Sequence, residues 1–119
     1  MPYASFPACE GETARLADII LADARFLPHA AGHTKKVLRF RAVSSGQSIA
    51  IEKRKGDPVV YIDAARARPS AHGFARTTVK PTGLTGRNSN LRAVFADAEL
   101  LAVKPADHDE FNRLLDCAA

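Results

Sequence analysis

The chain has 119 residues and a formal net charge of +4, and 46% of its residues are hydrophobic while 25% are charged. This composition is ordinary for one globular domain, and it excludes a chain that is disordered throughout. The amino-terminal residues lack the cationic and apolar regions of a secretory signal, and no apolar run is long enough to span a bilayer. We therefore expect a soluble, cytoplasmic protein that forms a single compact domain over residues 1–119.

Residues 1–12 are expected to form an irregular lead-in to a helix over residues 13–27. In that helix the apolar side chains recur at helical spacing with polar residues between them, and Pro28 would end it. The apolar stripe requires a sheet or another helix to cover it.

Three strands are expected over residues 37–43, 48–53 and 58–63, where side chains alternate between short turns that contain glycine. Strands joined in this way form an antiparallel meander. One face of the meander would pack against the first helix, whereas the face that carries Arg39 and Arg41 could be solvated.

The rest of the sequence predicts further strands and helices. A fourth strand is expected over residues 74–79, a helix of about two turns after a cap at one of residues 88–90, and a short buried strand over residues 100–103. Asp107 and Glu110 have the spacing of a capping box, which would start a last helix. This order favours an α+β fold. We expect an antiparallel or mixed sheet of four to five strands, with the helices at the N- and C-terminal ends packed on one face.

Positive charge is concentrated in the middle of the chain. Residues 35–92 hold thirteen Lys or Arg residues and three acidic residues, whereas residues 93–119 hold two basic and six acidic ones. If the central cations share one surface, that surface would attract polyanions by steering and counterion release. The alternative is that they are the ordinary solvating charges of strands and turns.

The segment from Gly83 to Arg92 is a candidate anion site at the start of a helix. Backbone N–H groups at Gly86, Arg87 and Asn88 could point at a phosphate, and the arginines could add charge-assisted contacts. The glycine spacing matches neither a Walker A motif nor GxGxxG. The alternative is a surface loop whose polar residues only cap the helix.

The turn after the second strand carries Lys53, Arg54 and Lys55, which could reach into a nucleic-acid groove or straddle a backbone. The alternative is a hairpin tip whose charge only keeps the chain soluble. Glu52 does not begin a metal-dependent nuclease motif, because the second residue after it is an arginine and no upstream strand offers a partner aspartate.

Cys9 and Cys117 lie near opposite termini and could form a disulfide, although buried thiols are the expectation in a reducing compartment. His29 and His33 have no carboxylate or thiol near them in the sequence, so we expect no metal site and no cofactor.

These patterns favour a non-enzymatic nucleic-acid-binding domain that contacts phosphates. One alternative is a protein-binding module or inhibitor, of the type that phages and mobile elements encode, which docks on an acidic or nucleic-acid-binding surface of a larger protein. A third hypothesis is a small metal-independent ribonuclease toxin that uses His72, Arg76 and Lys80 as acid, base and phosphate anchor. The residues expected to contact nucleic acid or another anion are Arg39, Arg41, Lys53, Arg54, Lys55, Arg76, Lys80, Gly86, Arg87, Asn88, Ser89 and Arg92.

Overall fold

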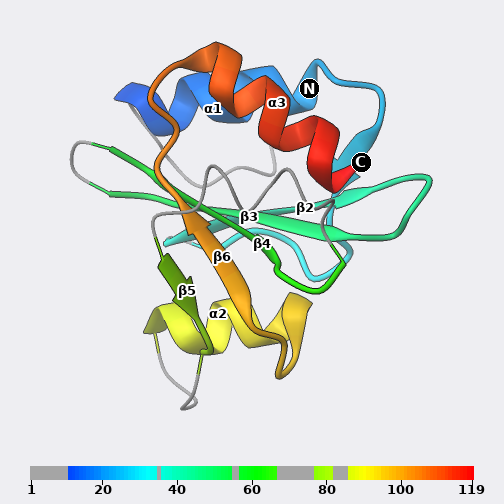
Figure 1. Cartoon of the computed structure of the whole chain (residues 1–119), viewed down its shortest axis with the longest axis vertical. Coiled ribbons are helices and arrows are strands. Elements are labelled where there is room, and N and C mark those ends of the chain that lie inside the picture. The colour runs from blue at the N-terminus through cyan, green and yellow to red at the C-terminus, as the bar shows by residue number, and fades with distance from the viewer. Residues whose placement is uncertain (1–10, 35, 55–56, 67–76, 82–85) are drawn as a thin grey trace.

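A computed structural model of the chain describes residues 11–34, 36–54, 57–66, 77–81 and 86–119 (Figure 1). These residues form three helices and six strands. In chain order the elements are α1 (Gly11–Leu21), β1 (Phe26–Pro28), β2 (Val37–Ala42), β3 (Ser48–Glu52), β4 (Val59–Asp63), β5 (Thr77–Val79), α2 (Gly86–Phe95), β6 (Leu100–Val103) and α3 (His108–Ala118).

The strands form one sheet in the order β1-β2-β3-β4-β6-β5, and every neighbouring pair is antiparallel. The predicted α+β fold with an antiparallel sheet is therefore confirmed. The sheet has six strands rather than four or five, because the segment predicted as the end of the first helix forms β1 instead. Helix α1 ends at Leu21, a turn follows, and Phe26 pairs with Ala42 at the edge of the sheet.

Helices α1 and α3 lie side by side on one face of the sheet (Figure 1). Their buried side chains join those of the central strands in one core, in which Leu16 and Ile20 of α1 and Phe111 and Leu114 of α3 cover Phe40 and its neighbours on the sheet. The prediction that the N- and C-terminal helices share one face is confirmed. Among the helices of the described residues, none is long and apolar enough to cross a bilayer.

The opposite face is not solvated as predicted, because α2 packs against it. Leu91 and Phe95, one turn apart on α2, form a second core with Tyr61, Val37 and other side chains of this face. The sheet therefore lies between two helical layers, with α1 and α3 on one side and α2 on the other (Figure 1). Sequence periodicity could not show that α2 covers this face, because the short apolar pattern of α2 does not indicate which face of the sheet it packs against.

The predicted start of α3 is confirmed in its main feature. The Asp107 side chain accepts a hydrogen bond from the Glu110 N–H at 2.8 Å, which satisfies one of the free donors at the helix start. The reciprocal bond of a capping box is displaced by one residue, since Glu110 Oε1 accepts from the N–H of Ala106 rather than of Asp107. Helix α2 begins at Gly86, slightly before the predicted cap.

Candidate functional site

Two lysines lie opposite each other where β2 begins and β3 ends. The N–H of Lys53 donates to the carbonyl oxygen of Lys36 at 2.8 Å, just beyond the last ladder pair, Val37 and Glu52. The N–H of Lys36 itself donates to Thr34 Oγ1 at 3.3 Å. Lys36 is exposed and Lys53 is half-buried. The backbone contact thus brings two lysines to the same end of the sheet.

Arg54, the next cation of the same turn, is held by an acid. Its Nε and Nη2 donate to Glu52 Oε1 at 3.2 and 3.0 Å, and the Tyr61 hydroxyl donates to the same oxygen at 2.6 Å. The hydrogen bond to Glu52 raises the pKa of the Arg54 guanidinium above its usual value. Glu52 therefore offsets much of the charge that Arg54 would offer to a ligand. Lys55 lies outside the described residues.

Arg39 is a structural residue rather than a surface contact, because it is only 6% exposed. Its guanidinium donates to the carbonyl oxygens of Gly32 (2.6 Å), Ala31 (2.8 Å) and Asn90 (3.2 Å). These bonds tie the loop before β2 to helix α2. Arg41, two residues along the same strand, is exposed. The expectation that both arginines project from one solvated face is therefore wrong, since α2 covers the position of Arg39.

The remaining predicted contacts follow β5, lie on α2 or lie outside the described residues. Lys80 follows β5 at the opposite end of the sheet, as the register from β5 through β6 and β4 to β3 requires. The backbones of Gly86, Arg87, Asn88 and Ser89 form the first turn of α2 rather than a loop before it, and their binding of an anion stays a prediction. Arg92 forms an ion pair with Asp97 at 3.4 Å. Arg76, like the histidine of the ribonuclease hypothesis, lies outside the described residues.

Sequence reasoning missed two cations that the fold brings to the same sheet end, Lys36 and Lys104. Lys104 is exposed and directly follows β6, whose last residue lies at the end where β4 begins. The pairing of Lys36 could have been read from the hairpin, because the short turn between two strands fixes their register. The placement of Lys104 depends on β6 pairing with β4, which the sequence does not reveal.

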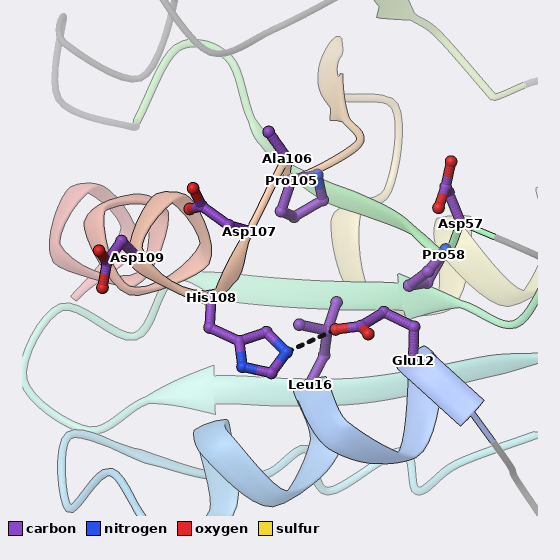
Figure 2. Close-up of a pocket in the computed structure, with 9 residues that line it drawn as sticks. All are labelled: Glu12, Leu16, Asp57, Pro58, Pro105, Ala106, Asp107, His108 and Asp109. Atoms are coloured by element: carbon purple, nitrogen blue, oxygen red, sulfur yellow. Dashed lines mark hydrogen bonds and ion pairs between the residues drawn. The ribbon is translucent and has the colours of Figure 1, made fainter.

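A pocket of about 480 Å³ lies where α1 and α3 begin, next to the start of β4 (Figure 2). His108 Nε2 and Glu12 Oε1 are 2.6 Å apart across it, and this hydrogen bond lowers the pKa of the Glu12 carboxyl. Asp107, Asp109 and Asp57 also line the pocket. Acidic groups stabilise the first turn of a helix, and two helices start here, so helix capping accounts for most of this negative charge.

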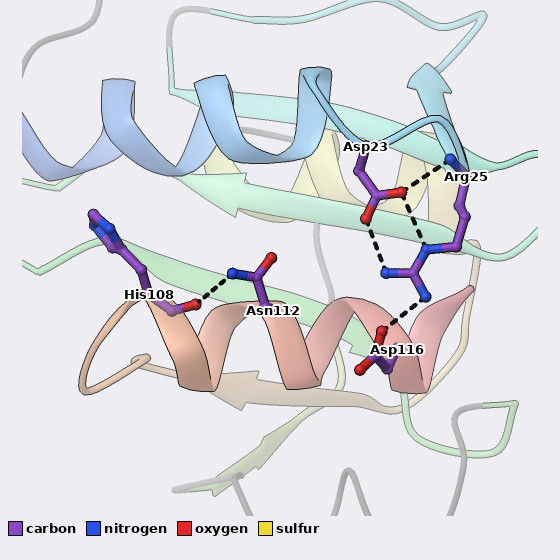
Figure 3. A network of polar contacts seen from close by, with 5 residues as sticks. All are labelled: Asp23, Arg25, His108, Asn112 and Asp116. Carbon is purple, nitrogen blue, oxygen red and sulfur yellow. Dashed lines mark hydrogen bonds and ion pairs between the residues drawn. The ribbon is translucent and has the colours of Figure 1, made fainter.

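A second polar network holds α3 against the segment after α1 (Figure 3). Arg25 donates to both carboxylate oxygens of Asp23 and, at 2.8 Å, to Asp116 near the end of α3. The hydrogen bond with Arg25 lowers the pKa of Asp23. The Asn112 amide donates to the His108 carbonyl oxygen one turn earlier. The Arg25–Asp116 contact joins α3 to the segment after α1, whereas the Asn112 bond lies within α3.

The histidines before β2 make local contacts. His33 Nδ1 accepts from the N–H of Arg39 at 2.9 Å, and His29 Nδ1 accepts from the N–H of Ala31 at 3.0 Å. Burial lowers the pKa of His33 to about 4, so its imidazole is neutral at pH 7. Within the described ranges, no three His, Cys, Asp or Glu residues are grouped so that they could hold a metal ion. Cys117 is buried beside α1, and its proposed partner Cys9 lies outside those ranges.

Comparison of the chain with protein-family models, with curated proteins and with solved structures found no match.

Proposed function

We propose that this protein is a non-enzymatic nucleic-acid-binding domain that contacts phosphates at the end of its sheet where β2 begins and β3 ends. The observation that supports the proposal is the backbone hydrogen bond between Lys53 and Lys36, which brings these two lysines to one end of the sheet. The contact places two positively charged residues at one end of the sheet, where their charges would attract an anion. Phosphate oxygens accept charge-assisted hydrogen bonds from lysine, so a nucleic-acid backbone supplies such anions at regular spacing.

The surroundings of the pair set the direction from which nucleic acid would approach. Glu12, Asp57 and Asp109 line the pocket beside β4 and would repel phosphates there. The β2–β3 side of the same end carries the two lysines. Lys35 and Lys55 add positive charge to the sequence on either side of these strand ends, and both lie outside the described residues.

A salt titration with matched variants tests the proposal. We expect the affinity of the full chain for DNA or RNA to fall steeply with salt, and each phosphate contact to contribute about 0.9 to the slope of log K against log salt on a duplex. Lys36→Gln and Lys53→Gln should each lower the slope by about that amount. Arg113→Gln removes the same charge from an exposed position on α3 and should leave the slope unchanged.

Two outcomes would contradict the proposal. One is a chain that binds no nucleic acid at low salt. The other is binding that weakens equally in the lysine variants and in the Arg113→Gln control, because the pair would then have no particular part in it.

A further inference from the structure

We propose that an exposed shelf on β1 and β2, beside α2, binds a segment of a partner protein in which an aliphatic side chain lies next to a carboxylate. The shelf consists of Leu27, Arg41 and Val43. Arg41 lies near the end of β2, whereas Lys36 precedes the start of that strand. The inference therefore concerns a second surface and goes beyond the proposed function.

Two aliphatic side chains of the shelf are exposed to solvent. Leu27 and Val43 are the exposed large hydrophobic residues of the described ranges, with exposed fractions of 52% and 50%. The register of β1 on β2 places Leu27 beside Arg41. Val43 is two residues beyond Arg41, and its N–H donates to the carbonyl oxygen of Arg25 at 2.8 Å, which holds it beside the start of β1. Apolar residues scattered singly are normal on a protein surface, but these two flank one cation.

Helix α2 forms a wall next to the shelf. The neighbours of Arg41 along β2 belong to the core under α1 and α3, so Arg41 and its partner Leu27 face the side of α2. On that side Arg41 pairs with Ser48 of β3, whose hydroxyl donates to the carbonyl oxygen of Val94 on α2 at 3.2 Å. Helix α2 therefore covers β3 next to Arg41 and leaves Leu27 exposed. A side chain of a partner can lie on the shelf with the helix beside it.

Arg41 supplies the charge that selects an acidic partner. Its side chain is exposed, and within the described part of the chain its guanidinium forms no hydrogen bond or ion pair. Burial lowers the pKa of the nearby His29, and the charges of Arg39 and Arg41 lower it further. This part of the surface is therefore positive. A guanidinium binds a carboxylate through two parallel hydrogen bonds, which fixes the direction of the partner segment.

The geometry argues against other occupants of the shelf. A further strand cannot pair with β1 in the usual two-way pattern, since the Phe26 N–H is bonded to the carbonyl oxygen of Asp23 and Pro28 has no N–H. A second copy of the chain that used the same surface would bring two Arg41 guanidinium groups together. A phosphate backbone would pair with the arginine but would gain nothing from the two aliphatic side chains. A segment with an acid beside an aliphatic residue uses both features.

A random peptide library displayed on phage tests the inference, with the full folded chain as bait at physiological salt. We expect the enriched peptides to carry Leu, Ile or Val next to Asp or Glu. The affinity of one enriched peptide should fall by about threefold to tenfold with Arg41→Gln, which removes a charge-assisted contact. Leu27→Thr and Val43→Thr should each weaken binding as well, because they remove aliphatic surface while keeping a residue that suits a strand. Urea denaturation checks that the variants fold.

Matched controls test the same contacts without relying on these variants. Arg113→Gln removes an equal charge from an exposed position on α3, and Lys36→Gln/Lys53→Gln removes the charges of the other surface. Neither should change the affinity for the peptide. A second peptide, in which amides replace the acids, should bind the unchanged chain as weakly as the first peptide binds Arg41→Gln.

Three results would overturn the inference. The first is a library from which no peptide of this kind is enriched. The second is an enriched peptide that binds the shelf variants, or binds in its amide form, as tightly as before. The third is a DNA oligonucleotide that displaces the peptide and binds the shelf more tightly, which would assign this surface to nucleic acid. Peptide binding that depends on the three shelf residues supports the inference whether or not the chain also binds nucleic acid.

Discussion

Arg39 and Asn90, which are 51 positions apart in the sequence, are joined by a hydrogen bond of 3.2 Å from the guanidinium to a backbone oxygen of α2. Two further bonds from the same guanidinium reach the carbonyl oxygens of Gly32 and Ala31. One buried cation therefore connects a loop, a strand and a helix.

Arg39→Ala should lower the free energy of unfolding by about 2–4 kcal/mol, because three backbone oxygens lose a charged donor and the aliphatic stem leaves the core. Arg39→Lys should recover only part of the loss, since an ammonium cannot reproduce the planar fork. Urea denaturation measures the free energy of unfolding of both variants. Arg41→Gln on the same strand is the control, and its exposed position should limit the change to about 0.5 kcal/mol. Equal effects at the two positions would show that Arg39 has no special role.

Glu52→Gln should strengthen binding to nucleic acid. The amide would still accept the hydrogen bond from Tyr61, but it would no longer neutralise Arg54, whose charge could then contact a phosphate. The salt slope should rise by about 0.9 for the added contact. Glu99→Gln makes the same change in net charge just before β6, at the opposite end of the sheet, and should leave the slope as it is. A larger effect from Glu99→Gln would indicate that the binding surface lies elsewhere.

The stability of the protein should fall as the pH is lowered through the range set by His33. The folded pKa is about 4 and the ordinary value is 6.5, so the unfolded chain takes up a proton first as the pH falls. The stabilisation linked to the neutral His33 side chain is fully present above pH 6.5. It decreases as the pH falls to about 4, and it does not change further below that pH. His33→Asn keeps an acceptor for the Arg39 N–H but cannot titrate in this range. Urea midpoints at pH 7, 5 and 4 should therefore depend less on pH in the variant, and identical profiles would contradict the prediction.

Asp107→Ala should destabilise the protein by about 1 kcal/mol, because the Glu110 N–H loses its acceptor at the start of α3. Asp109→Asn, two residues later, removes only a favourable interaction with the helix dipole and should cost about 0.3–1 kcal/mol. Thermal unfolding monitored by circular dichroism compares the two variants. A cost for Asp109→Asn greater than that for Asp107→Ala would mean that the cap contributes little.

Several elements could be predicted from the sequence because local patterns determine them. Alternation between short turns identified β2, β3 and β4, and the spacing of Asp107 and Glu110 identified the start of α3. Strand β1 was missed because Leu27 also fits the helical spacing of α1. The chain turns out of the helix after Leu21 and pairs with β2, an interaction with a distant segment that local periodicity does not contain.

The candidate site was less predictable than the fold. The cations of the central segment were visible, but their roles depend on contacts between distant residues. Arg39 is buried because α2 covers it, Arg54 is neutralised by Glu52, and Lys36 meets Lys53 through the register of a hairpin. Only the last of these follows from strand boundaries alone. The pocket at Glu12 requires the starts of two helices, far apart in the chain, to meet.

The packing of α2 against the second face of the sheet has a consequence for how this fold could change its specificity. With helices over both faces of the central strands, recognition is left mainly to turns and strand ends, which carry few core contacts. Under the proposed function, exchanging the β3–β4 turn for one of another length or charge should alter nucleic-acid binding while leaving both cores as they are. The domain is therefore a suitable scaffold for grafting recognition loops at this end of the sheet.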